Sequence, residues 1–181
     1  MTNCCTLEDY STPTTASFIA SSVEHCPQCG RKGKPIAIQT VKAMLAISLE
    51  RLRPTPYHFC RTPDCSVVYF AADGGQLILE RHLRERVHQK APHDEAVFVC
   101  YCFRYTPGSI RAEFIETGES AVVARVNAGI QAGQCACEIR NPQGSCCLGN
   151  IHSVVKRIAT ELQLAPTTDR NASNGTKLFG A

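Results

Sequence analysis

Twelve cysteines in a chain of 181 residues constrain this protein more than any other feature of its sequence. So many thiols must be disulfides, metal ligands or reactive groups, and the compartment decides among these. A secretory signal needs a basic start followed by an apolar run, but residues 1–22 contain no Lys or Arg. No later segment is apolar for long enough to span a bilayer. We therefore expect a cytoplasmic protein without membrane insertion, in which thiols stay reduced and metal ligation is the better explanation.

Two blocks of ordered pattern lie between polar ends. Residues 1–24 and 165–181 are rich in Ser, Thr, Asn or Gly and show no periodicity, so we expect disordered tails. The blocks at 25–90 and 95–164 have about 65 residues each, and a core of that size is marginal when unaided. Metal binding would supply the missing stability, because the free energy of ligation is also free energy of folding.

The two blocks differ in their secondary-structure pattern. In the first block, β-branched and aromatic residues predict strands near 57–60 and 67–70, and a helix is expected near 39–52. Residues 76–89 fit a strand or a helix equally well. The expected class is α+β: a small β-rich domain with one helix, followed by a small, mostly α-helical domain.

The helices of the second block have recognisable starts and ends. Thr106-Pro107 is typical of a helix start, with Thr as the N-cap and Pro at the first helical position. Ser120 could cap a second helix that ends at Gly133. A third helix is expected after Gly149, where apolar residues recur at helical spacing.

Two cysteine pairs in the first block predict a metal site. Cys26-Pro27-Gln28-Cys29-Gly30 is a knuckle, in which a two-residue spacing turns both sulfurs toward one point and the glycine permits the tight backbone. Cys60 and Cys65 supply a second pair across a turn between the two expected strands. Four thiolates suit a closed tetrahedral zinc site, while mononuclear iron, a disulfide or free core thiols are the alternatives. His25 and His58 flank these cysteines and are interpreted as surface or packing residues.

A second constellation lies in the other block. Cys100-Tyr101-Cys102 precedes the first expected helix, and Cys137 and Cys147 follow it, with Cys147 just before the third helix. The positive end of a helix dipole stabilises a thiolate or an anionic cluster. From spacing alone, the choice of ligands among Cys135, Cys137, Cys146 and Cys147 stays open, as do a second zinc and a redox disulfide.

Both motifs together resemble a known family. The segments VCYC (99–102) and CEIRNPQGSCC (137–147), with the Thr106-Pro107 helix start, look like the [2Fe–2S] module of CopZ-type copper chaperones, which is itself similar to the bacterioferritin-associated ferredoxin domain. The segments CPQCG and FCRTPDCSVVYF resemble the zinc-binding domain that precedes this module in the same proteins. The resemblance covers about residues 26–162, with both motifs in order.

The resemblance implies a ligand set for each centre. The cluster ligands would be Cys100, Cys102, Cys137 and Cys147. The zinc ligands would be Cys26, Cys29, Cys60 and Cys65. The family archetype also carries a heavy-metal-associated domain with an MxCxxC copper loop, whereas this sequence has methionine only at positions 1 and 44. We therefore do not expect such a domain to hand over Cu(I) from this polypeptide.

Charge and the remaining cysteines complete the prediction. Four thiolates on zinc, or on a [2Fe–2S] core, sum to −2, so two sites would change the formal net charge of +3 to about −1. That balance gives no reason to expect a nucleic-acid partner. Cys4 and Cys5 in the N-terminal tail suit a soft ion such as Cu(I), or else are accidental free thiols. Cys135 and Cys146 are interpreted as spare or packing thiols.

These features predict a metal-homeostasis protein of the metallochaperone type. Zinc would organise the first domain, and a one-electron cluster would reduce Cu(II) to Cu(I) for a copper-transporting ATPase or a separate copper chaperone. The redox partner is not identified by the sequence, and no pattern of an enzyme with a substrate pocket is present. The alternative hypotheses are a ferredoxin-like electron carrier or redox-sensing module without a copper role, and a purely structural cluster domain.

Overall fold

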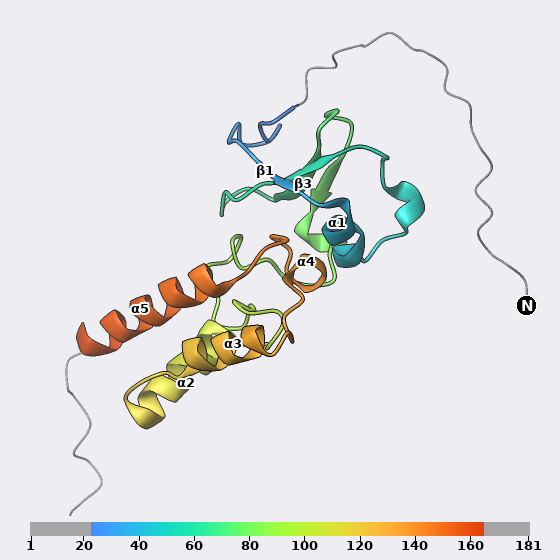
Figure 1. Ribbon diagram of the computed structural model, residues 1–181. Helices are drawn as coiled ribbons and strands as arrows, with labels where there is room; N and C mark the ends of the chain where they lie inside the picture. The colour runs from blue at the N-terminus through green and yellow to red at the C-terminus, as the bar shows by residue number, and fades with distance from the viewer. Residues whose placement is uncertain (1–22, 165–181) are drawn as a thin grey trace, which may run out of the picture.

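The computed structural model describes residues 23–164, which adopt an α+β fold (Figure 1). The predicted α+β class is therefore confirmed. Both expected disordered tails lie almost wholly outside the described residues, as do Cys4 and Cys5. Within residues 23–164, no helix combines the length and apolar character needed to span a bilayer.

A four-stranded antiparallel sheet forms the first part of the structure. Strands β1 (Lys34–Ile36), β2 (Tyr57–Phe59), β3 (Val67–Ala71) and β4 (Leu77–Leu79) lie side by side in sequence order. All five residues of β3 are buried. Tyr69 and Ala71 belong to the main apolar core with Val41, whereas Val67 and Phe70 pack around cysteines. The central strand therefore separates an ordinary core from the first group of thiols.

The helix expected near 39–52 is much shorter than predicted. Helix α1 spans Ile38–Met44, and after it come an extended Leu45 and a 3-10 helix at Leu49–Arg51. Leu45 pairs with Leu83, and the backbone on either side bonds to residues 82 and 84. The amide of Ala46 and the carbonyl of Met44 therefore bond to the segment around Leu83 and cannot form the hydrogen bonds of a longer helix. A tertiary contact thus overrides helix propensity at this position. The ambiguous region 76–89 begins as β4 and continues as a 3-10 helix at Glu80–His82.

Three longer helices build the second part. Helix α2 spans Pro107–Thr117, α3 spans Val122–Gln131 and α5 spans Leu148–Leu164. Thr106 caps α2 as predicted, since its hydroxyl accepts a hydrogen bond from Ser109 N at 3.1 Å. Helices α2 and α3 both pack against α5. Their shared core is made of β-branched side chains together with three cysteines: Val99, Ile110, Val122, Val126, Ile151, Val154, Ile158, Cys100, Cys137 and Cys147.

A short helix of the second part packs against the first part. Helix α4 (Cys137–Arg140) was not predicted, and it lies against α1, between the sheet and the longer helices (Figure 1). Beyond it, the buried hydroxyl of Tyr69 donates to the carbonyl of Pro142 at 2.6 Å, and Lys34 Nζ donates to Ser145 Oγ at 2.8 Å. The division of the chain into two domains stays a prediction, but side chains of the sheet directly contact the turn that precedes Cys147.

That turn requires glycine at position 144. Gly144 has a φ of 63°, a left-handed conformation that disfavours a Cβ atom. A Cβ there would also lie 3.0 Å from Thr40 Oγ1 and 3.2 Å from Ile36 Cγ1, both in the first part of the structure. The glycine therefore allows the turn to approach β1 and α1 closely.

We expect Gly144→Ala to lower the free energy of unfolding by about 2–4 kcal/mol, from left-handed strain and from crowding against Thr40 and Ile36. The measurement is urea denaturation of the metal-loaded protein. Gly118→Ala is the matched control, because Gly118 also has positive φ but a Cβ there meets nothing within 4 Å. In the control, the free energy of unfolding should fall only by the cost of the left-handed strain, about 1–2 kcal/mol. Equal losses in both variants would contradict the close approach.

Candidate metal centres

A knuckle at the N-terminal edge of the sheet presents two sulfurs of the first centre. Cys26 N donates to Arg31 O and Gly30 N donates to Cys26 O, both at 2.8 Å, so the backbone folds into a tight loop. Gly30 has a φ of 69°, which explains the glycine after the second cysteine. The amides of residues 28 and 29 are directed at the Cys26 sulfur. The sequence prediction of a knuckle is confirmed in this geometry.

The β2–β3 connection presents the other two sulfurs. Cys60 follows β2 directly, and its amide donates to Val68 O at 2.9 Å. Cys65 ends the loop, with its amide 3.3 Å from Thr62 O. Lys90 Nζ donates to the same Thr62 carbonyl at 2.8 Å. The antiparallel register of two strands therefore fixes where this cysteine pair lies.

All four sulfurs converge. The Sγ atoms of Cys26, Cys29, Cys60 and Cys65 all lie within 4.8 Å of one another. Cys26 and Cys65 are 3.8 Å apart, and Cys29 and Cys60 are 3.6 Å apart. Sulfurs that share one zinc at about 2.3 Å in a tetrahedron are separated by about 3.8 Å. The residues present therefore fit a single tetrahedral ion.

The thiols of the first centre differ widely in pKa. Burial, the largest effect at Cys29, raises the pKa, but hydrogen bonds with the Thr62 hydroxyl, the Arg31 amide and other thiols outweigh it and lower the pKa to about 6. Burial raises the pKa of Cys65 to about 12, and neighbouring thiols add to the effect. An ion that binds all four sulfurs must therefore displace protons at neutral pH.

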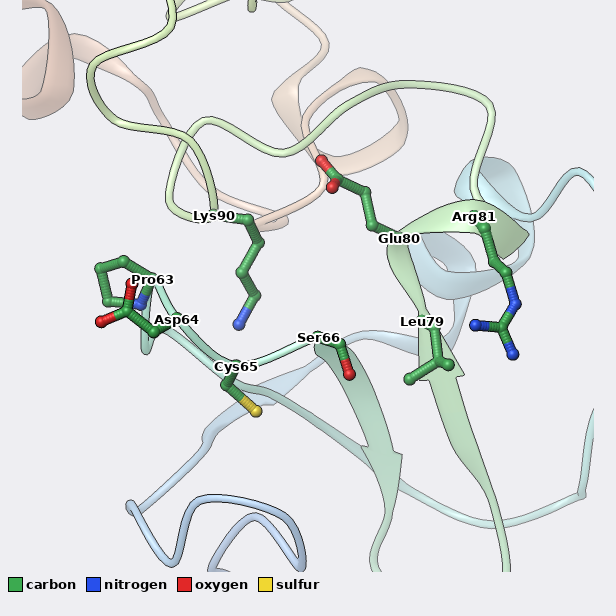
Figure 2. A pocket seen from close by; sticks show the side chains of 8 residues that line it. All are labelled: Pro63, Asp64, Cys65, Ser66, Leu79, Glu80, Arg81 and Lys90. Atoms are coloured by element: carbon green, nitrogen blue, oxygen red, sulfur yellow. The ribbon is translucent and has the colours of Figure 1, made fainter.

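A shallow cleft of about 420 Å³ borders this centre on its outer side (Figure 2). Lys90 extends from the opposite wall toward the loop that ends at Cys65, as the figure shows. The Cys65 sulfur points away from Lys90, toward the other thiols of the centre. Cys65 itself is only 3% exposed. The cleft therefore runs along the loop backbone, and the sulfur does not open into it.

The two histidines that flank the cysteines, His25 and His58, differ in burial. His25 is exposed, and His58 is buried with its ring stacked on Phe70, at 5.3 Å between ring centroids. Neither histidine belongs to the group of converging ligand atoms in the described part of the chain.

A second group of thiols lies in the core of the helices. Cys100 and Cys102 lie on a tight loop in which Cys100 and Tyr105 bond to each other through their backbones. Cys137 begins α4, and Cys147 immediately precedes α5. Cys100, Cys137 and Cys147 belong to one buried cluster, Cys102 packs against it, and Cys137 Sγ lies 3.7 Å from Cys102 Sγ. The four thiols that the resemblance implied therefore lie in or against one core, and of these four only Cys102 and Cys137 belong to a group of converging ligand atoms among the described residues.

Burial and hydrogen bonds give these four thiols different acidities. The bond with Cys147 is the largest effect on Cys137 and lowers its pKa to about 5, and the same partner lowers the pKa of Cys100 to about 7. For Cys147, those two bonds and then burial raise the pKa. Backbone amides of residues 102 and 103 are directed at the Cys100 sulfur, and the amide of Cys147 at Cys137. An amide that donates to a sulfur stabilises the thiolate form of that cysteine over its neutral thiol form.

Cys135 also belongs to this group, although the sequence left it open as a ligand and favoured a spare or packing thiol. Its Sγ lies 3.3 Å from that of Cys137 and 3.7 Å from that of Cys102, and these three sulfurs lie within 4.8 Å of one another. The available signal was the spacing Cys135-Ala136-Cys137, which repeats that of Cys100-Tyr101-Cys102. Cys146, by contrast, is exposed and lines a separate pocket with Lys34 and Arg61.

Comparisons with known proteins agree with the prediction that the first centre binds zinc. The CopZ zinc-finger family model, described as "Zinc binding domain", matches residues 23–84. Those residues hold the whole first centre. Residues 23–84 form a CopZ-like zinc-binding domain. No protein in the curated collection matches the chain.

A solved structure extends the likeness beyond that domain. The N-terminal domain of CopZ from Archaeoglobus fulgidus aligns with 27% sequence identity and a TM-score of 0.59, covering 72% of this chain and 96% of that domain. Since residues 23–84 are well under half of the chain, the similar fold includes part of the second block. A similar organisation of sheet and helices therefore occurs in the N-terminal domain of CopZ.

The affinity of the first centre for Zn²⁺ should rise with pH, because every thiol that keeps its proton must release it on binding. Each displaced proton contributes about tenfold per pH unit. Cys65 must release a proton on binding throughout the neutral range, and Cys29 must release a further proton below pH about 6. The plot of the logarithm of zinc affinity against pH should therefore be steeper below pH about 6. Competition with a chromophoric chelator between pH about 5 and 8 measures this slope.

Thr62→Val is the matched variant for this titration, since it removes the hydroxyl 3.4 Å from Cys29 Sγ. That change should raise the Cys29 pKa and move the steep region of the curve to higher pH. A pH-independent affinity in the original protein would show that these thiols are not the ligands.

Proposed function

We propose that this chain is a cytoplasmic metal-homeostasis protein of the metallochaperone type, with structural zinc at Cys26, Cys29, Cys60 and Cys65, and a [2Fe–2S] cluster at Cys100, Cys102, Cys137 and Cys147. It acts as an electron-transfer and metal-binding protein, and not as an enzyme with a substrate pocket. The convergence of four thiols from three separate segments into one apolar core, beside a CopZ-like zinc-binding domain, carries this proposal.

The environment of the second centre supports a cluster. Cys100 and Cys147 are 0% and 1% exposed, and the residues packed around them are mostly Val and Ile. Free thiolates in such a place would be costly to bury unless cations neutralised them. Cys147 also lies at the start of the 17-residue helix α5, whose positive end favours anionic sulfur.

A copper role follows from the chemistry of such a group. A [2Fe–2S] centre carries single electrons, and conversion of Cu(II) to Cu(I) requires one electron. The thiols around the centre hold the redox group in the core, with Cys102 partly exposed at its edge. Electrons would come from a redox partner, and Cu(I) would pass to a copper-transporting ATPase or a separate copper chaperone. Cys4 and Cys5 are proposed to capture the soft ion, and they lie outside the described residues.

Anaerobically purified protein should contain about two iron and two sulfide per chain in addition to one zinc. Cys147→Ser should lose iron and sulfide while it retains zinc, because the two centres have separate ligands. Metal analysis and the electron paramagnetic resonance spectrum of the reduced protein measure this. Lack of acid-labile sulfide in the unaltered protein would overturn the cluster.

The copper role has its own test. The reduced protein should convert about one Cu(II) to Cu(I) for each cluster, as seen with a Cu(I)-specific chromophoric ligand. The zinc-loaded Cys147→Ser variant is the control for reduction by free thiols. A cluster that accepts and donates electrons but leaves Cu(II) unchanged would overturn the copper role in favour of a ferredoxin-like carrier. The variant Cys4→Ser/Cys5→Ser should bind Cu(I) less tightly if the tail captures it.

A further inference from the structure

The second centre contains one more thiol than a [2Fe–2S] cluster needs. Five cysteines lie in or against its core, namely Cys100, Cys102, Cys135, Cys137 and Cys147, and the sulfurs of Cys102, Cys135 and Cys137 lie within 4.8 Å of one another. The proposed cluster uses four of them and leaves Cys135. Yet the Cys135 sulfur is as close to its neighbours as the sulfurs of the zinc-binding domain are to theirs.

We propose that Cys102, Cys135 and Cys137 form a three-thiolate site for a single soft cation such as Cu(I), and that this site excludes the cluster. The inference rests on the proposed function, because it assigns a second ligand to the same centre. Its basis is a triangle of Sγ atoms with sides of 3.3, 3.7 and 3.7 Å.

The size of this triangle suits one ion. Three sulfurs in a plane around a metal at about 2.3 Å are about 4.0 Å apart. The observed sides are shorter by about 0.3 Å for two of them and about 0.7 Å for the third, so an ion needs an outward movement of the thiols by less than an ångström. Soft thiolate ligands select Cu(I) over hard cations. On binding, three metal–sulfur bonds form, any thiol still protonated gives its proton to solvent, and no electron is transferred.

Access and support also favour this face of the centre. Cys102 and Cys135 are partly exposed, whereas Cys100 and Cys147 are fully buried, so an ion can reach the triangle from solvent. The amide of Ala136 donates to Cys102 Sγ at 3.3 Å, which stabilises a thiolate there. Because Cys102 and Cys137 are also proposed cluster ligands, the two occupants cannot be present together. Copper loading and cluster loading therefore become alternative states of one centre.

The test uses the full chain with Cys4→Ser and Cys5→Ser, zinc-loaded and free of iron and sulfide, titrated anaerobically with Cu(I) against a Cu(I) chelator. We expect one tightly bound Cu(I) per chain without zinc release. Adding Cys135→Ser should weaken binding by at least about 100-fold, since loss of even an outer-shell partner costs about 10–100-fold. Adding Cys146→Ser, an exposed cysteine beside Lys34 and Arg61, should change nothing.

Cluster reconstitution separates this inference from the proposed function. Cys135→Ser should still take up iron and sulfide, which also shows that it folds, whereas Cys100→Ser should lose the cluster but keep tight Cu(I) binding. Unchanged Cu(I) affinity in Cys135→Ser, or loss of the cluster in that variant, would overturn the three-thiolate site. If no variant binds a cluster but Cu(I) binding still requires Cys135, the proposed cluster fails and this site stands.

Discussion

Sulfurs held less than 4 Å apart repel one another once they lose their protons, and the rest of this structure depends on how that repulsion is avoided. In both centres the thiols come from separate segments and lie among buried apolar residues. Neither water nor distance can screen thiolate charges there, so these sulfurs either keep their protons or need cations. Each half of the chain is too small for a strong core of its own. If the cysteines of a half bind an ion, the free energy of that binding adds to the folding free energy of the half.

The ligand pattern of the first centre could be predicted because it is local. A knuckle such as Cys26–Cys29 and a hairpin loop such as Cys60–Cys65 each fix two sulfurs through short-range turn geometry. Only the pairing of the two loops is long-range, and the antiparallel register of the sheet provides it. The Thr106 cap and the glycine ends of the helices could be predicted for the same reason, since their hydrogen bonds join residues within one turn.

Three features could not be predicted, because each depends on contacts between distant segments. Helix α1 ends at Met44, where the chain pairs with residues 82–84, and no local residue signals this end. Helix α4 has only four residues and is held by packing on α1, so it has no periodic signature. The approach of Cys135 to Cys102 depends on how the loop before α4 meets the loop after Val99. Spacing alone therefore left the ligand set of the second centre open.

The turn at residues 141–145 gives the two centres a route for mutual influence. It leads from α4 to Cys147, and it is fixed by Tyr69 and Lys34, which belong to the zinc-binding domain. An ion that orders the sheet at the first centre would therefore also order the backbone that positions Cys147. Because coupling between binding sites is reciprocal, an ion or cluster at the second centre must stabilise the first by the same free energy. Exchange of occupants at the second centre would then be felt at the zinc site through one hydrogen-bonded turn, without any change in the zinc ligands.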